Sequence, residues 1–189
     1  DASVISSIES LPAVSRVELV APGVKPGSAG ERIRGGNRLK ATNNSGVTAT
    51  QLSMLGIDQM HADGFRGEGM SIAVFDGGFP GINHAIPFKH LFEEGRIHTD
   101  VSYDFVHDKA NVFGEDDHGT KVLSLIGAYE AGIYTGSAYK AAFILFITED
   151  DPTEYRIEEY NWLFAAERAD SLGVDIITAS MGYSDFDEK

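Results

Sequence analysis

The sequence predicts an α/β fold, in which a three-layer, doubly wound, mostly parallel sheet has helices on both faces. Three short segments are almost entirely apolar, as strands buried on both faces are; they span 72–75, 141–147 and 174–179. Segments with apolar residues at helical spacing lie between them. Such strand–helix–strand alternation is typical of parallel sheets covered on both sides.

Composition limits the classes of function. The chain has 189 residues, which suits one domain or slightly more. It has 15 Lys and Arg against 29 Asp and Glu, so the net charge is −14. This charge argues against binding to nucleic acid or to an anionic membrane surface. The longest apolar run, 141–147, is too short to span a bilayer. The absence of cysteine excludes disulfides, thiol nucleophiles and thiolate metal sites.

The N-terminal part divides into two segments. Residues 1–20 contain a helical pattern over 4–11 and a roughly alternating, strand-like pattern over 13–20. These two elements are too small to fold alone. Residues 21–46 are rich in glycine, proline and basic residues and have no hydrophobic periodicity. We expect this second segment to be a flexible, protease-accessible linker.

Residues 47–189 carry the alternating elements of the sheet domain. The helix expected at 151–172 begins with an acidic cap and a proline at its first position, and Gly173 is its expected C-cap. The expected elements, in chain order, are helix 51–64, strand 71–75, strand 99–105, helix 121–128, central strand 141–147, helix 151–172 and buried strand 174–179.

Asp76 is the first candidate for chemistry. It directly follows the apolar strand and precedes Gly77 and Gly78. Parallel sheets place ligands and catalytic groups at the carboxyl ends of their strands. An Asp-Gly pair is also a common turn, so taken alone Asp76 fits either reading.

His118 is the second candidate. It lies at the start of a short apolar helix, directly after Asp117 and before Gly119. A histidine there can act as a general base when a carboxylate fixes its tautomer. The alternative is a surface histidine beside an acidic helix N-terminus.

The segment 176–182 is the third candidate. Here an apolar strand continues into the small residues Ala179 and Ser180, then Met181 and Gly182. Small residues at a strand end allow an extended peptide to lie against the backbone. An ordinary strand-to-loop transition is the simpler alternative.

Other motifs are missing. The chain has no Gly-x-Ser-x-Gly elbow, no dinucleotide fingerprint and no phosphate loop. Helix capping explains the acidic run 149–151 better than cation binding does. No histidine belongs to a His-Glu-x-x-His pattern, so none of the remaining five is predicted to bind a metal; they are His61, His84, His90, His98 and His107.

Together the three candidate segments, in this order, resemble the subtilisin-like serine proteases, the subtilases. The matching segments are 72–78, 118–122 and 176–182, and the resemblance covers about 51–183. In that family the first motif carries the triad aspartate, the second carries the triad histidine, and the third lines the specificity pocket. The resemblance thus implies that Asp76 orients His118 and that His118 is the general base. It also implies that the substrate groove is bordered by Ser180, Met181 and Gly182.

The resemblance has further implications. It makes 1–20 the tail of an inhibitory α+β propeptide, 21–46 the linker in which such propeptides are cut, and 47–189 the N-terminal part of a truncated catalytic domain. The implied partners are a polypeptide substrate, the chain's own propeptide and the remainder of the catalytic domain. The implied location is secreted or in the cell envelope. No cofactor is required for this chemistry, and calcium is allowed as a structural ion.

The chain also departs from the family pattern. Gly77 replaces the usual serine or threonine, Lys121 replaces a second histidine, and Met181 replaces a leucine. The Gly-Thr-Ser segment that carries the family's nucleophile does not occur in the sequence. We therefore expect a serine endopeptidase precursor segment whose nucleophile lies outside this chain. Two alternatives are a non-catalytic pseudoprotease that binds peptides or a partner, and an unrelated doubly wound hydrolase or binding domain.

Overall fold

The computed structural model describes residues 2–18, 46–150 and 153–182. Its centre is a four-stranded sheet in the order β2–β5–β1–β6, and all neighbouring strands are parallel. The strands are β1 (Ser71–Asp76), β2 (Tyr103–Asp104), β5 (Ala142–Ile147) and β6 (Ile176–Ala179). The predicted α/β class and parallel sheet are confirmed.

Alternate residues of the two central strands point to opposite faces of the sheet, as the pleat requires. On one face, Ile72 and Val74 of β1 belong to the larger core cluster with Leu91 and Leu123. These leucines come from α4 (Lys89–Glu93) and α5 (His118–Gly127). The larger cluster therefore packs the sheet against α4 and α5.

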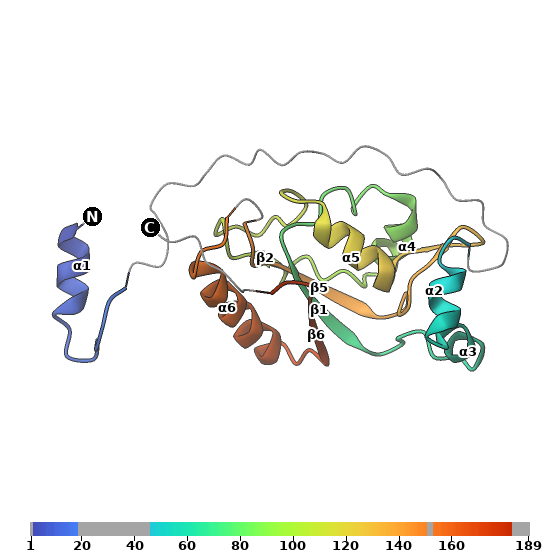
Figure 1. The fold of residues 1–189 in the computed structure, drawn as a ribbon, viewed down its shortest axis with the longest axis horizontal. Coiled ribbons are helices and arrows are strands. Elements are labelled where there is room, and N and C mark those ends of the chain that lie inside the picture. Colours follow the sequence, from blue (N-terminus) through green and yellow to red (C-terminus); the bar gives the residue numbers. More distant parts are fainter. Residues whose placement is uncertain (1, 19–45, 151–152, 183–189) are drawn as a thin grey trace.

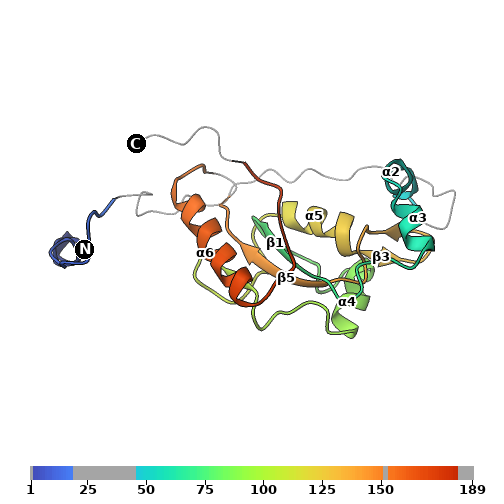
Figure 2. The same cartoon turned by 90° about the horizontal axis from the view of Figure 1, so that it is seen from below.

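The opposite face of the sheet packs against α6 (Ile157–Ser171). Ala73 and Phe75 of β1 form a second core cluster with Ala165 and Ala169 of this helix. Figures 1 and 2 show α6 and α5 on opposite sides of the sheet. This arrangement gives the three layers that the sequence predicts.

Smaller elements surround the sheet. The helices α2 (Ala49–Met54) and α3 (Ile57–Ala62) occupy the place of the single helix expected at 51–64, because Gly56 between them takes a left-handed φ of 70°. The 3-10 helix η1 (Ile86–Phe88) leads into α4, and β3 (Tyr129–Glu130) pairs with β4 (Tyr134–Thr135) in an antiparallel hairpin. Gly46 forms an isolated bridge with Tyr134, which joins the start of the domain to this hairpin.

Four further predicted elements of the sheet domain need correction. The strand expected at 99–105 is limited to β2, because Ser102 turns its hydroxyl back to the carbonyl of His98. The last strand is not buried: Ile176 and Ile177 of β6 are 46% and 40% exposed. The helix expected at 121–128 begins three residues earlier, at His118.

The fourth correction concerns α6, which starts at Ile157 rather than at the expected cap. The N–H of Thr153 donates to the carbonyl of Asp150 in a turn, and the carboxylate of Glu158 accepts the N–H of Tyr155. Glu158 thus ties the first turn of the helix to Tyr155, the residue before the N-cap Arg156. Residues 151–152 lie outside the described residues. At the other end, Gly173 has a left-handed φ of 72° directly after the helix, which confirms the expected C-terminal glycine.

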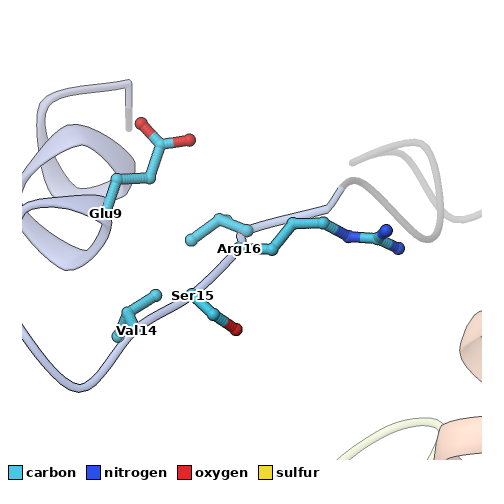
Figure 3. Close-up of a pocket in the computed structure, with 5 residues that line it drawn as sticks. Glu9, Val14, Ser15 and Arg16 are labelled. Carbon is cyan, nitrogen blue, oxygen red and sulfur yellow. The ribbon is translucent and has the colours of Figure 1, made fainter.

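The N-terminal segment contains α1 (Ala2–Glu9), as the helical pattern over 4–11 predicts. The strand predicted over 13–20 is not formed at 14–18. Residues 19–20 lie outside the described residues, and so does the linker expected at 21–46, except for Gly46. Figure 3 shows an open depression beside α1, lined by Glu9, Val14, Ser15, Arg16 and Val17. Within the described ranges, no helix has the length and apolar character that a membrane span needs.

Candidate active site

Asp76 and His118 meet at the carboxyl edge of the sheet. Asp76 is the last residue of β1, and its side chain is 1% exposed. His118 is the first residue of α5, and its side chain is 50% exposed. The Nδ1 atom of His118 lies 2.9 Å from Oδ1 and 3.1 Å from Oδ2 of Asp76. The predicted contact between the two candidate residues is therefore present.

The buried carboxylate decides the tautomer of the imidazole. A carboxylate only accepts hydrogen bonds, so Nδ1 of His118 carries the proton and donates it to Asp76. In the neutral ring this leaves Nε2 as an acceptor on the more exposed side of the residue. The hydrogen bond from His118 to Asp76 raises the pKa of His118 above its usual value, although partial burial opposes this.

Backbone geometry brings α5 close to β1. Gly119 is buried in the first turn of α5, and a Cβ atom there would lie 2.4 Å from the carbonyl oxygen of Gly78 and 2.8 Å from Cβ of Asp76. Only glycine therefore fits without displacing the helix. The N–H of His118 donates to Oδ1 of Asp116 at 2.7 Å, which fixes the start of the helix.

Asp76 accepts two further hydrogen bonds. The backbone N–H of Gly77 donates to Oδ1 at 2.8 Å. The hydroxyl of Ser180, just after β6, donates to Oδ2 at 3.0 Å. Charge-assisted hydrogen bonds of this kind hold a carboxylate in one orientation. Gly77 has no hydroxyl to offer, and Ser180 supplies one from the position that follows β6.

The three residues predicted to border a groove lie at different places. Ser180 contacts the carboxylate of Asp76, and Met181 packs partly buried against the second core cluster. Gly182 has open space around its α-carbon. Their expected contact with a peptide stays a prediction. The bond from Ser180 to Asp76 was missed, because the order of the strands, and not the local pattern, places β6 beside β1.

Comparison with known structures identifies the class of this fold. The chain matches the MycP3 protease from the type VII (ESX-3) secretion system with a TM-score of 0.52 and 20% identity, over 85% of this chain and 46% of that one. It matches the epidermin leader peptide processing serine protease EpiP from Staphylococcus aureus with a TM-score of 0.51 and 19% identity, over 74% and 34% of the two chains. It matches MycP1 from Mycobacterium smegmatis with a TM-score of 0.51 and 18% identity, over 75% of this chain and 40% of that one.

These likenesses show that the chain has a subtilisin-like fold. The chain spans less than half the length of each of the three proteins. Comparison with models of protein families gives no match, and comparison with curated proteins gives none either.

Proposed function

We propose that this chain carries the general base and the orienting carboxylate of a subtilisin-like serine endopeptidase. The Asp76–His118 pair at the carboxyl edge of a subtilisin-like sheet is the single observation that carries this proposal. Asp76 holds His118 with Nε2 available to accept a proton from a serine hydroxyl. His118 would then return that proton to the leaving amine.

The nucleophile of this enzyme belongs to polypeptide outside these 189 residues. No Gly-Thr-Ser segment occurs in the 189 residues. The substrate is a polypeptide that lies along 180–182. Residues 1–20 act as a propeptide tail, 21–46 as the cleavable linker, and 47–189 as the first part of the catalytic domain. The protein is exported to the cell envelope or beyond, as the EpiP and MycP likenesses suggest.

The non-catalytic alternative rests on the substitutions at 77 and 121. Gly77 still donates its N–H to Asp76. Lys121 forms an ion pair with Asp117, at 2.6 Å between Nζ and Oδ1. The hydrogen bond between Asp76 and His118 is present although positions 77 and 121 differ from the family pattern. The two substitutions therefore do not favour the pseudoprotease over the enzyme.

The test is an assay of casein hydrolysis. The 189-residue chain alone should give no enzymatic rate, because loss of the nucleophile removes most of the acceleration in such triads. Mixing it with the polypeptide that follows it in the parent protein should restore hydrolysis. The variant His118→Ala should abolish the restored rate, whereas His84→Ala, at an exposed histidine, should preserve it.

Two outcomes would contradict the proposal. Hydrolysis that survives His118→Ala would remove His118 from the mechanism. A correctly assembled mixture that hydrolyses nothing would favour the peptide-binding pseudoprotease.

A further inference from the structure

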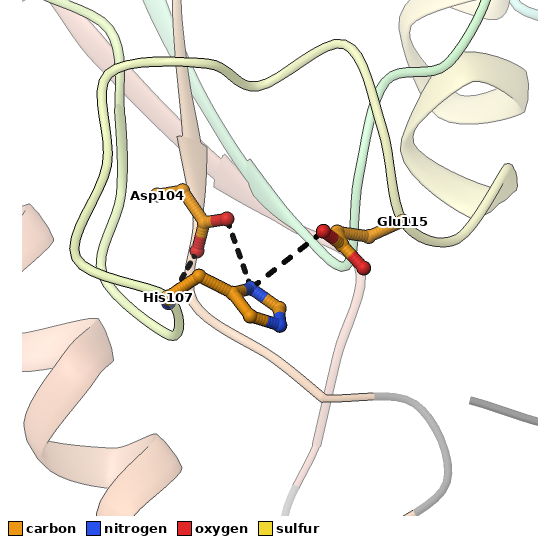
Figure 4. Close-up of side chains that lie close together, drawn as sticks. All are labelled: Asp104, His107 and Glu115. Atoms are coloured by element: carbon orange, nitrogen blue, oxygen red, sulfur yellow. Dashed lines mark hydrogen bonds and ion pairs between the residues drawn. The ribbon is translucent and has the colours of Figure 1, made fainter. Parts of the chain in front are cut away.

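The loop between β2 and α5 brings together three side chains that can ligate a metal. These are Asp104, His107 and Glu115 (Figure 4). Nδ1 of His107 lies 2.9 Å from Oδ2 of Asp104 and 3.9 Å from Oε1 of Glu115. One ligand atom from each residue lies within 4.8 Å of the other two. The separations of three and eight residues along a loop have no periodicity, so the sequence analysis predicts no metal ligand at His107.

The backbone of the loop fixes two of these ligands. Asp104 and Lys109 exchange two backbone hydrogen bonds, at 2.9 and 3.1 Å, which close a tight turn. Within this turn the N–H of His107 donates to Oδ1 of the fully buried Asp104 at 2.8 Å. Oδ2 of the same carboxylate is thereby directed toward the imidazole. Ligands held in this way lose little conformational entropy when they bind an ion.

The third ligand comes from the far end of the loop. Glu115 forms an isolated antiparallel bridge with Gly78, two residues beyond Asp76, and lies three residues before His118. Its Oε1 points toward His107 in Figure 4. An ion bound here would therefore connect β2 to the two segments that carry the candidate active site.

The chemistry of the ligands selects the ion. An imidazole nitrogen with two carboxylates suits Zn²⁺ and similar divalent metals, whereas Ca²⁺ takes six to eight oxygen ligands. The ligand atoms of a tetrahedral Zn²⁺ site lie about 3.3 Å apart, given metal–ligand bonds of roughly 2.0–2.1 Å. The observed 2.9 and 3.9 Å separations lie on either side of this value.

Lys109 supplies a positive charge at the same place. Its Nζ lies 2.7 Å from Oε1 of Glu115 and 3.5 Å from Oδ2 of Asp104. The ammonium of Lys109 therefore lies within ion-pair distance of both carboxylates that a metal would use. Its side chain is 40% exposed and has room to swing into solvent when a metal takes over the two carboxylates.

We propose that Asp104, His107 and Glu115 form a binding site for a divalent metal of the Zn²⁺ class, in competition with the Lys109 ammonium. A metal can bind Nδ1 of His107 only when this nitrogen carries no proton, so the tautomer that would bind is the one protonated at Nε2. The bound ion takes one oxygen from each carboxylate, and Lys109 is released. The site is separate from the proposed peptidase chemistry and holds whether or not that chemistry is correct.

Isothermal titration calorimetry of the 189-residue chain tests the site. Zn²⁺ should bind with one ion per chain, Co²⁺ should give the visible absorption of a tetrahedral complex, and Ca²⁺ should bind far more weakly. His107→Ala and Glu115→Gln should each weaken Zn²⁺ binding by more than about 100-fold, since even changes in the residues that support ligands cost roughly 10- to 100-fold. His84→Ala, at an exposed histidine outside the loop, should leave the affinity unchanged.

Lys109→Gln gives the opposite prediction. Removal of the competing ammonium should tighten Zn²⁺ binding by about two- to fivefold. This is roughly the change in the dissociation constant that corresponds to the free energy of one exposed ion pair. Thermal unfolding in chelator checks that each variant is folded, and His107→Gln replaces any alanine variant that is not. The proposal is overturned if Zn²⁺ fails to bind the folded parent chain, if binding persists in both ligand variants, or if Lys109→Gln weakens it.

Discussion

At the scale of single residues, the pKa of His118 depends mainly on Asp76. The hydrogen bond and charge of this carboxylate raise the pKa of His118, so Asp76→Asn should lower that pKa. The raised pKa also means that the ion pair stabilises the fold fully below about pH 6.5, the value for an unperturbed histidine, and that this contribution is lost as pH rises through the folded-state pKa. Proton NMR titration of the imidazole in both variants measures the shift. Asp116→Asn removes a carboxylate with a weaker effect on His118, so it should lower the pKa of His118 by less. An equal decrease in the two variants would contradict the role of Asp76 as the main partner of His118.

Glu158 makes the stability of the fold depend on pH for a different reason: burial, and not an oppositely charged partner, raises its pKa. It is 2% exposed at the start of α6, and burial raises its pKa to about 8, although the N–H of Tyr155 opposes the shift. The nearby carboxylates of Glu149 and Glu154 raise it further. The folded state thus holds the proton more tightly, and stability falls as pH rises from about 4.5 to 8, by at most roughly 1.4 kcal/mol per pH unit for one group.

The variant Glu158→Gln tests this dependence because it cannot ionise and keeps an oxygen for the Tyr155 N–H. Urea unfolding should show similar stabilities for parent and variant near pH 5 and a more stable variant at pH 8. Glu159→Gln, at the exposed neighbouring position, is the matched control and should show no such trend. A stability difference that is constant across this pH range would refute the raised pKa.

The sequence predicts some site residues better than others. Asp76 and His118 each lie at the junction of an apolar element and a glycine, and local pattern alone marks both junctions. Glu158 and Ser180 acquire their roles only from the packing of distant segments. A carboxylate at 158 looks like part of a solvated helix face until α6 is placed on the sheet. For the same reason, the sequence analysis missed the cluster around His107.

At the scale of elements, the two central strands were easier to predict than the helices or the other strands. The two central strands are buried on both faces, and their continuous apolar runs identify β1 and β5 almost to the residue. Helical spacing within 157–172 predicts one apolar face of α6 that contains Tyr160, Phe164, Ala165 and Ala169. Tyr160 and Phe164 are nevertheless 41% and 49% exposed. Ala165 and Ala169 of the same predicted face are buried as expected, because small side chains let the helix approach the sheet closely. Helical spacing shows which residues share a face and not which face the sheet covers.

The contact between α5 and β1 gives a prediction at this scale. Gly119→Ala adds a Cβ atom that would lie 2.4 Å from the carbonyl oxygen of Gly78, so the helix must shift away from the strand. We expect a loss of about 1–3 kcal/mol from overpacking, which outweighs the gain of up to about 1 kcal/mol in helix propensity. The shift should lengthen the bond from His118 to Asp76 and lower the pKa of His118. Gly114→Ala, where the added Cβ meets open space, should be nearly neutral in thermal unfolding and in the NMR titration. A fully stable Gly119→Ala with an unchanged His118 titration would contradict the close packing.

At the scale of the whole molecule, strong negative charge coexists with an apolar edge. β6 pairs only with β1 among the described strands, and Ile176 and Ile177 on it are exposed. Leu163 and Phe164 of α6 are exposed as well. An unpaired apolar edge strand readily pairs with another chain. The net charge of −14 opposes such association through repulsion, but salt screens charges beyond about 8 Å at 0.15 M.

We therefore expect the 189-residue chain to self-associate in moderate salt through β6. Sedimentation velocity over a concentration series should show a rising weight-average mass for the parent chain and a smaller rise for Ile177→Lys, because an edge lysine disfavours strand pairing. The control is Met54→Lys, at a residue of α2 that is 80% exposed. Both substitutions make the net charge less negative by one, so both weaken charge repulsion equally. A decrease in association specific to Ile177→Lys must then come from the edge, and equal behaviour of the two variants would show that β6 is not the contact.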